Sequence, residues 1–505
     1  MQIVKKTLAA AVILALTGPA FAMAADRTTA NVSVDSVYYS YIDKLSGMGY
    51  LKTLPNGARP YSRMQMARWC LEAEEKSAEK PMPAYLADEL KALENYLAPE
   101  MASLKGNPTE DTLRLRSVAV EGDYLKADRF SYSDATDSGS WAPFGANRNG
   151  HKYGRNGNLA LSAEVSGNIG HETAISIKGR TSWDKDNDGT ASLEEAYIKT
   201  RAGSFAFEAG RQALTWGEGY SGHLLLGNQM KPLTTLQAHL ANPVKIGGFF
   251  HFLGDFDFHA FYGQLDKDRA SDAQGRGVTD YDHPGILGLR VDLTPADWVT
   301  LGASRVSMMG GKHHSLDRSD WRKWTFGTNE DDNDKWDDIG GFDFKLRFPA
   351  FQLYGEFMGE DQAGGLPSKW GWRLGTYIPK LNADGSWDMI LETAKTTDVW
   401  YSHWVFQNGW TYSGDIMGDD MGNDARKYYA RINHYLPGEK TLSFYGLRTE
   451  RQKNRDGATV NEAGITGRMK LHGNMYLDGT LGYAEVKNHG TDHDYFGGVK
   501  VEWDF

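Results

Sequence analysis

The sequence predicts an all-β transmembrane barrel of about eighteen antiparallel strands, preceded by a small N-terminal periplasmic α-helical domain. Three observations lead to this fold class: a secretory signal at the start, side chains that alternate in polarity from Thr112 onward, and connections that are short and long in turn. We therefore divide the chain into a signal peptide at 1–25, a periplasmic helical domain at 26–110 and an outer-membrane β-barrel at 111–505.

The first segment predicts export. Lys5 and Lys6 precede an apolar run at 7–16, and small residues at 20–22 or 22–24 offer a cleavage site. The apolar run is too short to cross a bilayer as a helix. We expect the mature protein to reach the outer membrane of a diderm bacterium, with its N-terminal domain in the periplasm.

Composition narrows the class further. The chain carries a formal charge of −11, which argues against nucleic acid as a partner. A single cysteine, Cys70, excludes an internal disulfide framework, and its place on an apolar helical face predicts a buried small side chain rather than a nucleophile. The 57 glycines and 12% aromatic residues are typical of an outer-membrane barrel facing lipid.

Residues 26–110 predict three short amphipathic helices. Helical spacing of apolar residues begins at Val37, and a second helix begins at Ser62, where Gln65 completes a capping-box arrangement. A third begins at Ala84. Three short helices bury little surface alone, so we expect them to pack together and against something larger, as a cap or a plug.

From Thr112 onward, the polarity of the side chains alternates with a period of two residues. At the C-terminus, Tyr495, Val499 and Trp503 point to one face while Lys500 and Glu502 point to the other. The predicted strands are 113–131, 158–168, 171–183, 192–202, 205–215, 244–253, 256–265, 285–293, 298–308, 339–348, 351–361, 370–379, 387–396, 426–436, 440–451, 461–471, 475–486 and 494–505. A soluble β-sandwich would show the same period of two residues, so only the lengths of the connections can distinguish it from a barrel.

The connections favour a barrel in the outer membrane. Tight turns, as at 169–170 and 203–204, alternate with long segments at 132–157, 216–243, 266–284, 309–338 and 397–425. Outer-membrane barrels have short periplasmic turns and long external loops. This alternation of short and long connections predicts that the helical domain and the C-terminal Phe505 lie on the periplasmic side.

The chain resembles the capsule assembly Wzi family of outer-membrane proteins. The resemblance is carried by Arg59-Pro60-Tyr61-Ser62-Arg63, by the segment from Trp216-Gly217 to Lys231-Pro232, and by the plan of helices followed by strands. It implies an eighteen-stranded barrel with a lectin-like, non-enzymatic role that holds capsular or other surface polysaccharide at the cell surface. Outer-membrane lipid is the second expected partner.

The first of these motifs also resembles a single S-layer-homology module. In such modules the entry usually reads T-R-x-E, whereas Gln65 replaces the acid in this chain. The resemblance suggests a weak cell-wall contact through the N-terminal domain.

Polysaccharide contact needs flat aromatic faces with polar groups around them. The predicted external loops supply both. The candidate residues are Trp216, Tyr220, Asn228, Trp321, Trp324, Trp400, Trp404 and Trp410. The alternative for Trp400 and Trp404 is an aromatic girdle at the membrane interface, since both lie near a strand end.

A candidate calcium loop lies at 184–189, followed by Glu195. Asp184, Asp186, Asp188 and Glu195 match the spacing of a calcium-binding loop. Its flanks are predicted strands rather than helices, so a solvated acidic hairpin end is the alternative.

The long segment 216–243 has a further predicted role. Its glycines permit sharp turns, and Leu224, Leu225 and Leu226 need cover from water. We expect this segment to fold inward and constrict the barrel. Two other function classes stay open: a porin or diffusion channel, which needs an open lumen, and a membrane-embedded hydrolase, for which the sequence shows no catalytic motif.

Overall fold

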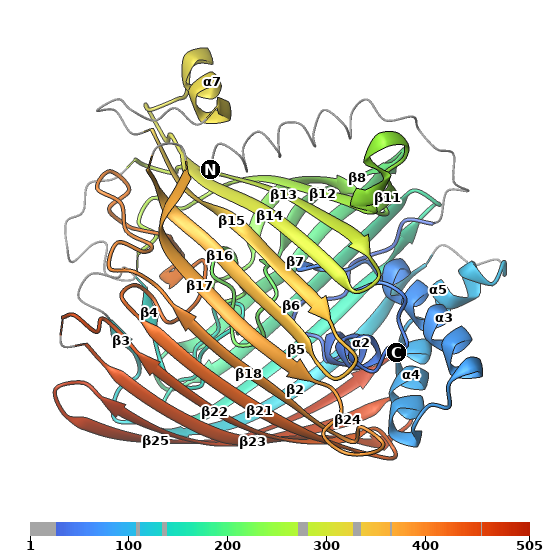
Figure 1. The fold of residues 1–505 in the computed structure, drawn as a ribbon. Helices are drawn as coiled ribbons and strands as arrows, with labels where there is room; N and C mark the ends of the chain where they lie inside the picture. Colours follow the sequence, from blue (N-terminus) through green and yellow to red (C-terminus); the bar gives the residue numbers. More distant parts are fainter. Residues whose placement is uncertain are drawn as a thin grey trace.

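The computed structural model describes residues 27–107, 112–133, 139–270, 281–326, 335–363, 366–455 and 457–505, so the predicted signal peptide lies outside the described residues. Within these ranges, eighteen strands of 8 or more residues form one closed antiparallel barrel (Figure 1). The barrel closes at β2, which pairs with β5 on one side and β25 on the other. The predicted fold class is confirmed.

The wall of the barrel follows the chain order. Its long strands are β2 (Leu113–Lys126), β5 (Asn156–Ile169), β6 (Thr173–Asp184), β7 (Asp188–Ala202), β8 (Phe205–Gln212), β10 (Leu233–Leu240), β12 (Asp255–Gln264), β13 (Gly285–Ala296), β14 (Val299–Met309), β15 (Trp336–Arg347), β16 (Gln352–Ala363), β17 (Leu366–Ile378), β18 (Trp387–Lys395), β21 (Arg426–Leu436), β22 (Lys440–Glu450), β23 (Thr459–His472), β24 (Met475–Lys487) and β25 (Thr491–Asp504). Two-residue strands form small pairings beside them: β1 (Ala58–Arg59) with β9 (Thr215–Trp216), β3 (Tyr132–Ser133) with β4 (Ser140–Trp141), β19 (Thr411–Tyr412) with β20 (Asp415–Ile416), and β11 (Val244–Lys245) with β12.

Alternation along each strand separates the two faces of the wall. On β13 the guanidinium of Arg290 is fully buried inside the barrel, where it donates to Asp292 at 2.6 Å and to Asp343 at 2.7 Å. On the next strand Leu301 points the other way and is 42% exposed. Charged side chains fill the lumen because each has a partner there, while the outer face offers apolar side chains to lipid.

Four helices cover one end of the barrel (Figure 1): α2 (Tyr38–Gly47), α3 (Arg63–Glu79), α4 (Ala84–Tyr96) and α5 (Ala98–Leu104). The predicted cap of α3 is present, since the Ser62 side chain accepts a hydrogen bond from the Gln65 amide at 3.1 Å. Cys70 on α3 is fully buried, as predicted. Among the described residues no helix is long and apolar enough to span a membrane.

Helix α2 enters the mouth of the barrel. The Lys44 ammonium is fully buried and donates to the carbonyl oxygens of Pro379 and Gly385, at 2.7 Å each, and to Asp388 at 3.2 Å. Tyr38 donates to Asp504 on β25 at 2.7 Å. The helices therefore plug this end, which agrees with the expectation that they pack against something larger.

One predicted strand is wrong. Residues 244–253 contain only β11, followed by the 3-10 helix η1 (Gly248–Leu253), and the missing barrel strand is β10 at Leu233–Leu240. The aromatic run in 248–253 has no alternation, and its flanking glycines take positive φ values, +67° at Gly248 and +72° at Gly254, which turn the backbone out of a strand. The strand count is unchanged, but the external connection is shorter than 216–243 and ends at β10.

Candidate functional site

The connection between β8 and β10 folds into the barrel, as predicted. Two carboxylates of the wall hold its backbone. Glu356 accepts hydrogen bonds from the amides of Glu218, Gly219 and Leu224 at 3.0, 2.9 and 2.8 Å, and Glu392 accepts from those of Tyr220 and Ser221. Charged acceptors make these bonds stronger than neutral ones. We name residues 213–232 the inner loop.

A glycine makes this close approach possible. Gly217 has a φ of +136°, and a Cβ added there would lie 2.5 Å from a carboxylate oxygen of Glu356. Only a residue without a side chain can both take this conformation and let the backbone reach the wall. The glycine-rich sequence of the inner loop thus serves its docking on the barrel.

The inner loop also meets the N-terminal region inside the barrel. Ala58 of β1 pairs with Trp216 of β9, and the Gly217 amide donates to the Gly57 carbonyl at 3.0 Å. The segment before α3 and the inner loop therefore touch within the lumen. This contact joins the plugged end of the barrel to the loop that enters from the opposite end.

A second loop, 397–425, fastens the inner loop from the other side. Tyr401 donates to the Leu224 carbonyl at 2.6 Å and the Trp410 indole donates to the Leu225 carbonyl at 3.1 Å. Although burial favours the protonated acid, Lys427 and Arg373 lower the pKa of Asp419 in this loop to about 2. The two loops share one apolar core with the walls β12 to β18, so they constrict that side of the lumen.

This packing places four of the predicted sugar-contacting tryptophans out of reach. Trp216, Trp400 and Trp410 are 3%, 0% and 0% exposed in the shared core of the loops. Trp324 is 7% exposed because it fixes helix α7 (Arg318–Phe326) to β14, with its indole donating to Ser307 and the Arg305 guanidinium 4.2 Å from its ring. We assign these four side chains to the core rather than to polysaccharide contact, because burial keeps a sugar from their faces.

The other four candidates are divided. Trp321 on α7 and Trp404 in the loop 397–425 are 41% and 63% exposed, so both offer an open aromatic face. Asn228 is used inside the protein, where its side chain donates to the Asn147 carbonyl at 3.0 Å. Tyr220 lines a cavity of about 340 Å³ deep in the barrel, between α2 and the wall β21 to β25.

The predicted calcium site does not form. Asp184 and Asp188 pair across the tight end of the β6–β7 hairpin, and Asp184 accepts hydrogen bonds from the turn itself at Asp186 and Asn187. Asp186 binds Arg155 at 2.7 Å, and Glu195 lies far along β7 among buried residues. Within the described residues no group of three or more histidine, cysteine, aspartate or glutamate side chains is placed to hold a metal ion. The solvated hairpin, the alternative, is what the structure contains.

The motif that resembles an S-layer-homology module is also used internally. Arg63 is 1% exposed and binds Glu100 at 2.9 Å, and Tyr61 is 2% exposed. Arg59 binds Asp43 at 3.2 Å. These contacts bury Tyr61 and Arg63 within the protein, whereas Arg59 stays partly exposed.

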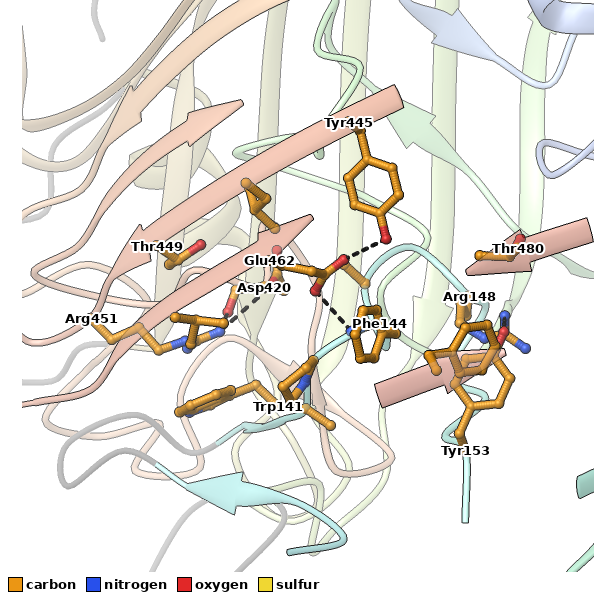
Figure 2. A pocket seen from close by; sticks show the side chains of 16 residues that line it. Trp141, Phe144, Arg148, Tyr153, Asp420, Tyr445, Thr449, Arg451, Glu462 and Thr480 are labelled. Atoms are coloured by element: carbon orange, nitrogen blue, oxygen red, sulfur yellow. Dashed lines mark hydrogen bonds and ion pairs between the residues drawn. The ribbon is translucent and has the colours of Figure 1, made fainter. Parts of the chain in front are cut away.

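A pocket of about 250 Å³ (Figure 2) lies against β22 to β25, away from the strands β12 to β18 that pack on the constriction. It is formed between the first long loop, the second inserted loop and the inner face of β22 to β25. Its lining residues are Trp141, Ala142, Pro143, Phe144, Ala146, Arg148, Tyr153, Asp420, Tyr445, Leu447, Thr449, Arg451, Val460, Glu462, Thr480 and Phe496. We name it the upper pocket, because both of these loops belong to the end opposite the helices.

Polar groups of the upper pocket are held in place by one another. Glu462 accepts hydrogen bonds from the Tyr445 hydroxyl and the Phe144 amide, both at 2.9 Å (Figure 2). Arg451 binds the carboxylate of Asp420 at 3.5 Å. Fixed donors and acceptors of this kind can orient a ligand's hydroxyl groups without first rearranging.

Aromatic faces complete the upper pocket. Phe496 lies between two rings, with its centroid 5.4 Å from that of Phe144 and 4.5 Å from that of Tyr153. The Arg148 guanidinium lies 3.7 Å from the Tyr153 centroid, and the Arg451 guanidinium lies 4.2 Å from that of Trp141. Flat apolar surfaces with charged and hydroxyl groups at their edges suit a ligand that has both apolar faces and many hydroxyls.

The sequence contained one signal for this pocket. The loop 132–157, which the connection lengths place on the external side, combines Trp141, Phe144 and Tyr153 with asparagines and glycines. Tyr445, Glu462 and Phe496 come from three different strands. These three side chains come together only because the barrel closes, and no local sequence pattern predicts which strands will be neighbours.

Proteins similar to this chain include one curated protein and several solved structures. An uncharacterized 55.8 kDa protein in the cps region of Klebsiella pneumoniae is 30% identical over 165 residues, which are 30% of each chain, so this chain spans less than a third of that curated relative. The solved structure described as "Wzi, an outer membrane protein involved in group 1 capsule assembly in Escherichia coli, is a carbohydrate binding β-barrel" is 18% identical with a TM-score of 0.71, over 94% of this chain and 100% of that one. Pseudomonas aeruginosa OccD3 (OpdP) is 11% identical with a TM-score of 0.44, over 78% of this chain and 91% of that one.

The Escherichia coli structure has the same fold as this chain, a barrel of eighteen strands with a helical N-terminal region. The model of the capsule assembly protein Wzi family matches residues 125–497, which is most of the chain. The match begins at the end of β2 and reaches into β25, so it contains the inner loop and every strand that lines the upper pocket. This chain belongs to the capsule assembly protein Wzi family.

Proposed function

We propose that this protein is a non-enzymatic outer-membrane barrel that binds capsular or other surface polysaccharide on its external side during capsule assembly. The observation that carries the proposal is the upper pocket, in which aromatic faces and fixed hydrogen-bonding groups line a cavity of about 250 Å³. Family membership and the carbohydrate-binding barrel of the same fold support it.

The chemistry of the pocket fits a saccharide. One face of a sugar ring is apolar and packs on an aromatic ring, while its hydroxyls need both donors and acceptors at the edge. Phe144, Tyr153 and Tyr445 are partly exposed and supply rings. Glu462 supplies an acceptor and Arg148 supplies donors. A cavity of about 250 Å³ is far smaller than a polysaccharide, so we propose that it takes a short stretch or an end of the polymer.

The exposed tryptophans extend the proposed surface. Trp321 and Trp404 both lie outside the barrel core on external segments, where a polymer that passes the pocket would meet them. Each is a single exposed aromatic residue, so we assign them a secondary part in the binding of a long chain.

Substitution in the upper pocket tests this proposal. We expect Tyr445→Ala to weaken binding of polysaccharide purified from the producing bacterium by about tenfold, which corresponds to about 1.4 kcal/mol for one lost ring contact. The matched control is Phe444→Ala on the same strand, since Phe444 is 40% exposed on the outer face. Equal affinity of the two folded variants would contradict the assignment of the pocket.

A further inference from the structure

The connection between β10 and β12 carries an apolar surface that the proposed polysaccharide site does not use. Phe249, Phe250 and Phe252 of η1 are 83%, 47% and 57% exposed, close together on a 3-10 helix of 6 residues. Exposed phenylalanines in such a group are unusual on a protein surface in water and mark an interaction site. We name residues 241–254 the outer flap.

The outer flap lies at the plugged end of the barrel. Its first residue, Ala241, donates its amide to the carbonyl of Ser204, in the tight β7–β8 turn, at 2.9 Å. Asn242 accepts a hydrogen bond from Arg68 of α3. Figure 1 shows the green coil of η1 beside β8 and β11, at the end where α3 and α5 lie. The flap therefore belongs to the periplasmic side.

The flap packs on the outside of the wall next to β11, whose two residues pair with β12 in the barrel sheet. Phe256 and Phe258 of β12 and Val291 of β13 point outward, because their neighbours Asp257 and Arg290 point into the lumen. These outward side chains are nevertheless only 8%, 8% and 4% exposed, in a cluster that includes Ile246 of the flap. The flap thus covers a patch of wall that would otherwise face lipid, and it presents its own phenylalanines in place of that patch.

The surroundings identify what the phenylalanines meet. On the outer wall beside the flap, Leu236 is 63% exposed and Tyr262 is 47% exposed. At the same end of the barrel, Trp298 and Phe351 are 51% and 38% exposed in or next to tight turns, as expected of an aromatic girdle at the membrane interface. The flap continues this apolar zone outward from the wall.

A second protein chain is a poorer partner for this surface than lipid. A stable protein interface needs about 800 Å² on each side, which is far more than one short turn can offer. Amphipathic surface segments with aromatic residues, by contrast, enter the boundary between lipid headgroups and acyl chains as single elements.

We propose that the outer flap is a membrane anchor whose phenylalanines insert among the phospholipid acyl chains of the periplasmic leaflet. The inference rests on the proposed outer-membrane location. It adds a lipid-binding element on one side of the barrel, at β10 to β13, which fixes the depth and tilt of the barrel in the leaflet and holds the plugged end against the membrane.

Spin labelling tests the anchor directly. The native Cys70 is fully buried, and burial raises the pKa of its thiol, so a nitroxide reagent will react with an introduced cysteine instead. We would label Phe249→Cys and, separately, Phe252→Cys in phospholipid vesicles. Collisions with oxygen, which enters lipid, are then compared with collisions with a water-soluble nickel chelate.

Two control labels define the scale. Leu236→Cys reports the lipid-facing wall, and Glu75→Cys, at a side chain 73% exposed on α3, reports water. We expect oxygen collisions to exceed nickel collisions at 249 and 252, as at 236, and the ratio to invert at 75. Labels at 249 and 252 that behave like the one at 75, or that broaden through contact with a second labelled chain, would overturn the anchor. A water-exposed label at 236 would instead overturn the membrane location of the whole barrel.

Discussion

Glu356 is the residue on which the constriction of the lumen depends most clearly. Its carboxylate accepts three backbone hydrogen bonds from the inner loop and is fully buried. Glu356→Ala would leave three buried amides without that acceptor. Hydrogen bonds to a charged group contribute roughly 1.5–3 kcal/mol each, so three at the low end give about 4.5 kcal/mol. We take about 4 kcal/mol for the docked loop, because the Gly219 amide is only partly buried.

A loss of about 4 kcal/mol changes the ratio of docked to undocked loop by about 10³-fold. We expect single-channel recordings in a planar bilayer to show larger and more frequent openings for Glu356→Ala than for the natural protein. Glu356→Gln keeps one oxygen acceptor and should fall between the two. Glu392 still holds Tyr220 and Ser221 in both variants, so the barrel itself should fold.

The reasoning fails if Glu356→Ala conducts no more than the natural protein. Heat-modified migration of the barrel in gel electrophoresis would first establish that the variant is folded. In that case the apolar core shared with the loop 397–425, rather than the carboxylate latch, would hold the inner loop in place.

The helical region gives three further predictions. Burial and the neighbouring Glu74 raise the pKa of Glu94 to about 6, so the folded protein binds the proton of this acid more tightly than the unfolded chain does. The stability that this proton binding adds is present below about pH 4.5 and is lost as the pH rises through about 6. It amounts to less than about 2 kcal/mol, because solvent screens this partly exposed group. Thermal unfolding across this pH range should show the loss, and Glu94→Gln should remove it. Ser62→Ala removes the cap of α3 and should lower the free energy of unfolding by about 1 kcal/mol in denaturant titrations, whereas Ser62→Asp should preserve it. A thiol reagent should leave Cys70 unmodified in the folded protein and modify it after denaturation; rapid modification of the folded protein would contradict its burial.

Much of the barrel could be predicted because its strands obey a local rule. Side chains such as Arg290 and Leu301 reveal which face of the wall they occupy by their parity alone, and the alternation of turn lengths orders the strands. The rule failed at 244–253, where a dense aromatic run outweighed the weaker pattern of Leu233–Leu240. An aromatic run at a membrane interface need not be part of a strand.

The functional site was less predictable, because it depends on where the loops go. Trp216, Trp400 and Trp410 have the composition of a sugar-binding surface, yet all three are buried. Glu356 and Glu392 on distant strands hold the inner loop inside the barrel, and the loop 397–425 packs on it. The upper pocket joins Tyr153 of a loop with Phe496 near the C-terminus. Such distant pairs come together only through barrel closure.

A structure of the protein with an oligosaccharide cut from the polysaccharide of the producing bacterium tests polysaccharide binding in the upper pocket most directly. We predict a sugar ring in the upper pocket, packed against the ring of Tyr445 or Phe144, with its hydroxyls bonded to Glu462 or Arg148. An oligosaccharide bound elsewhere, with the upper pocket free of sugar, would contradict the account.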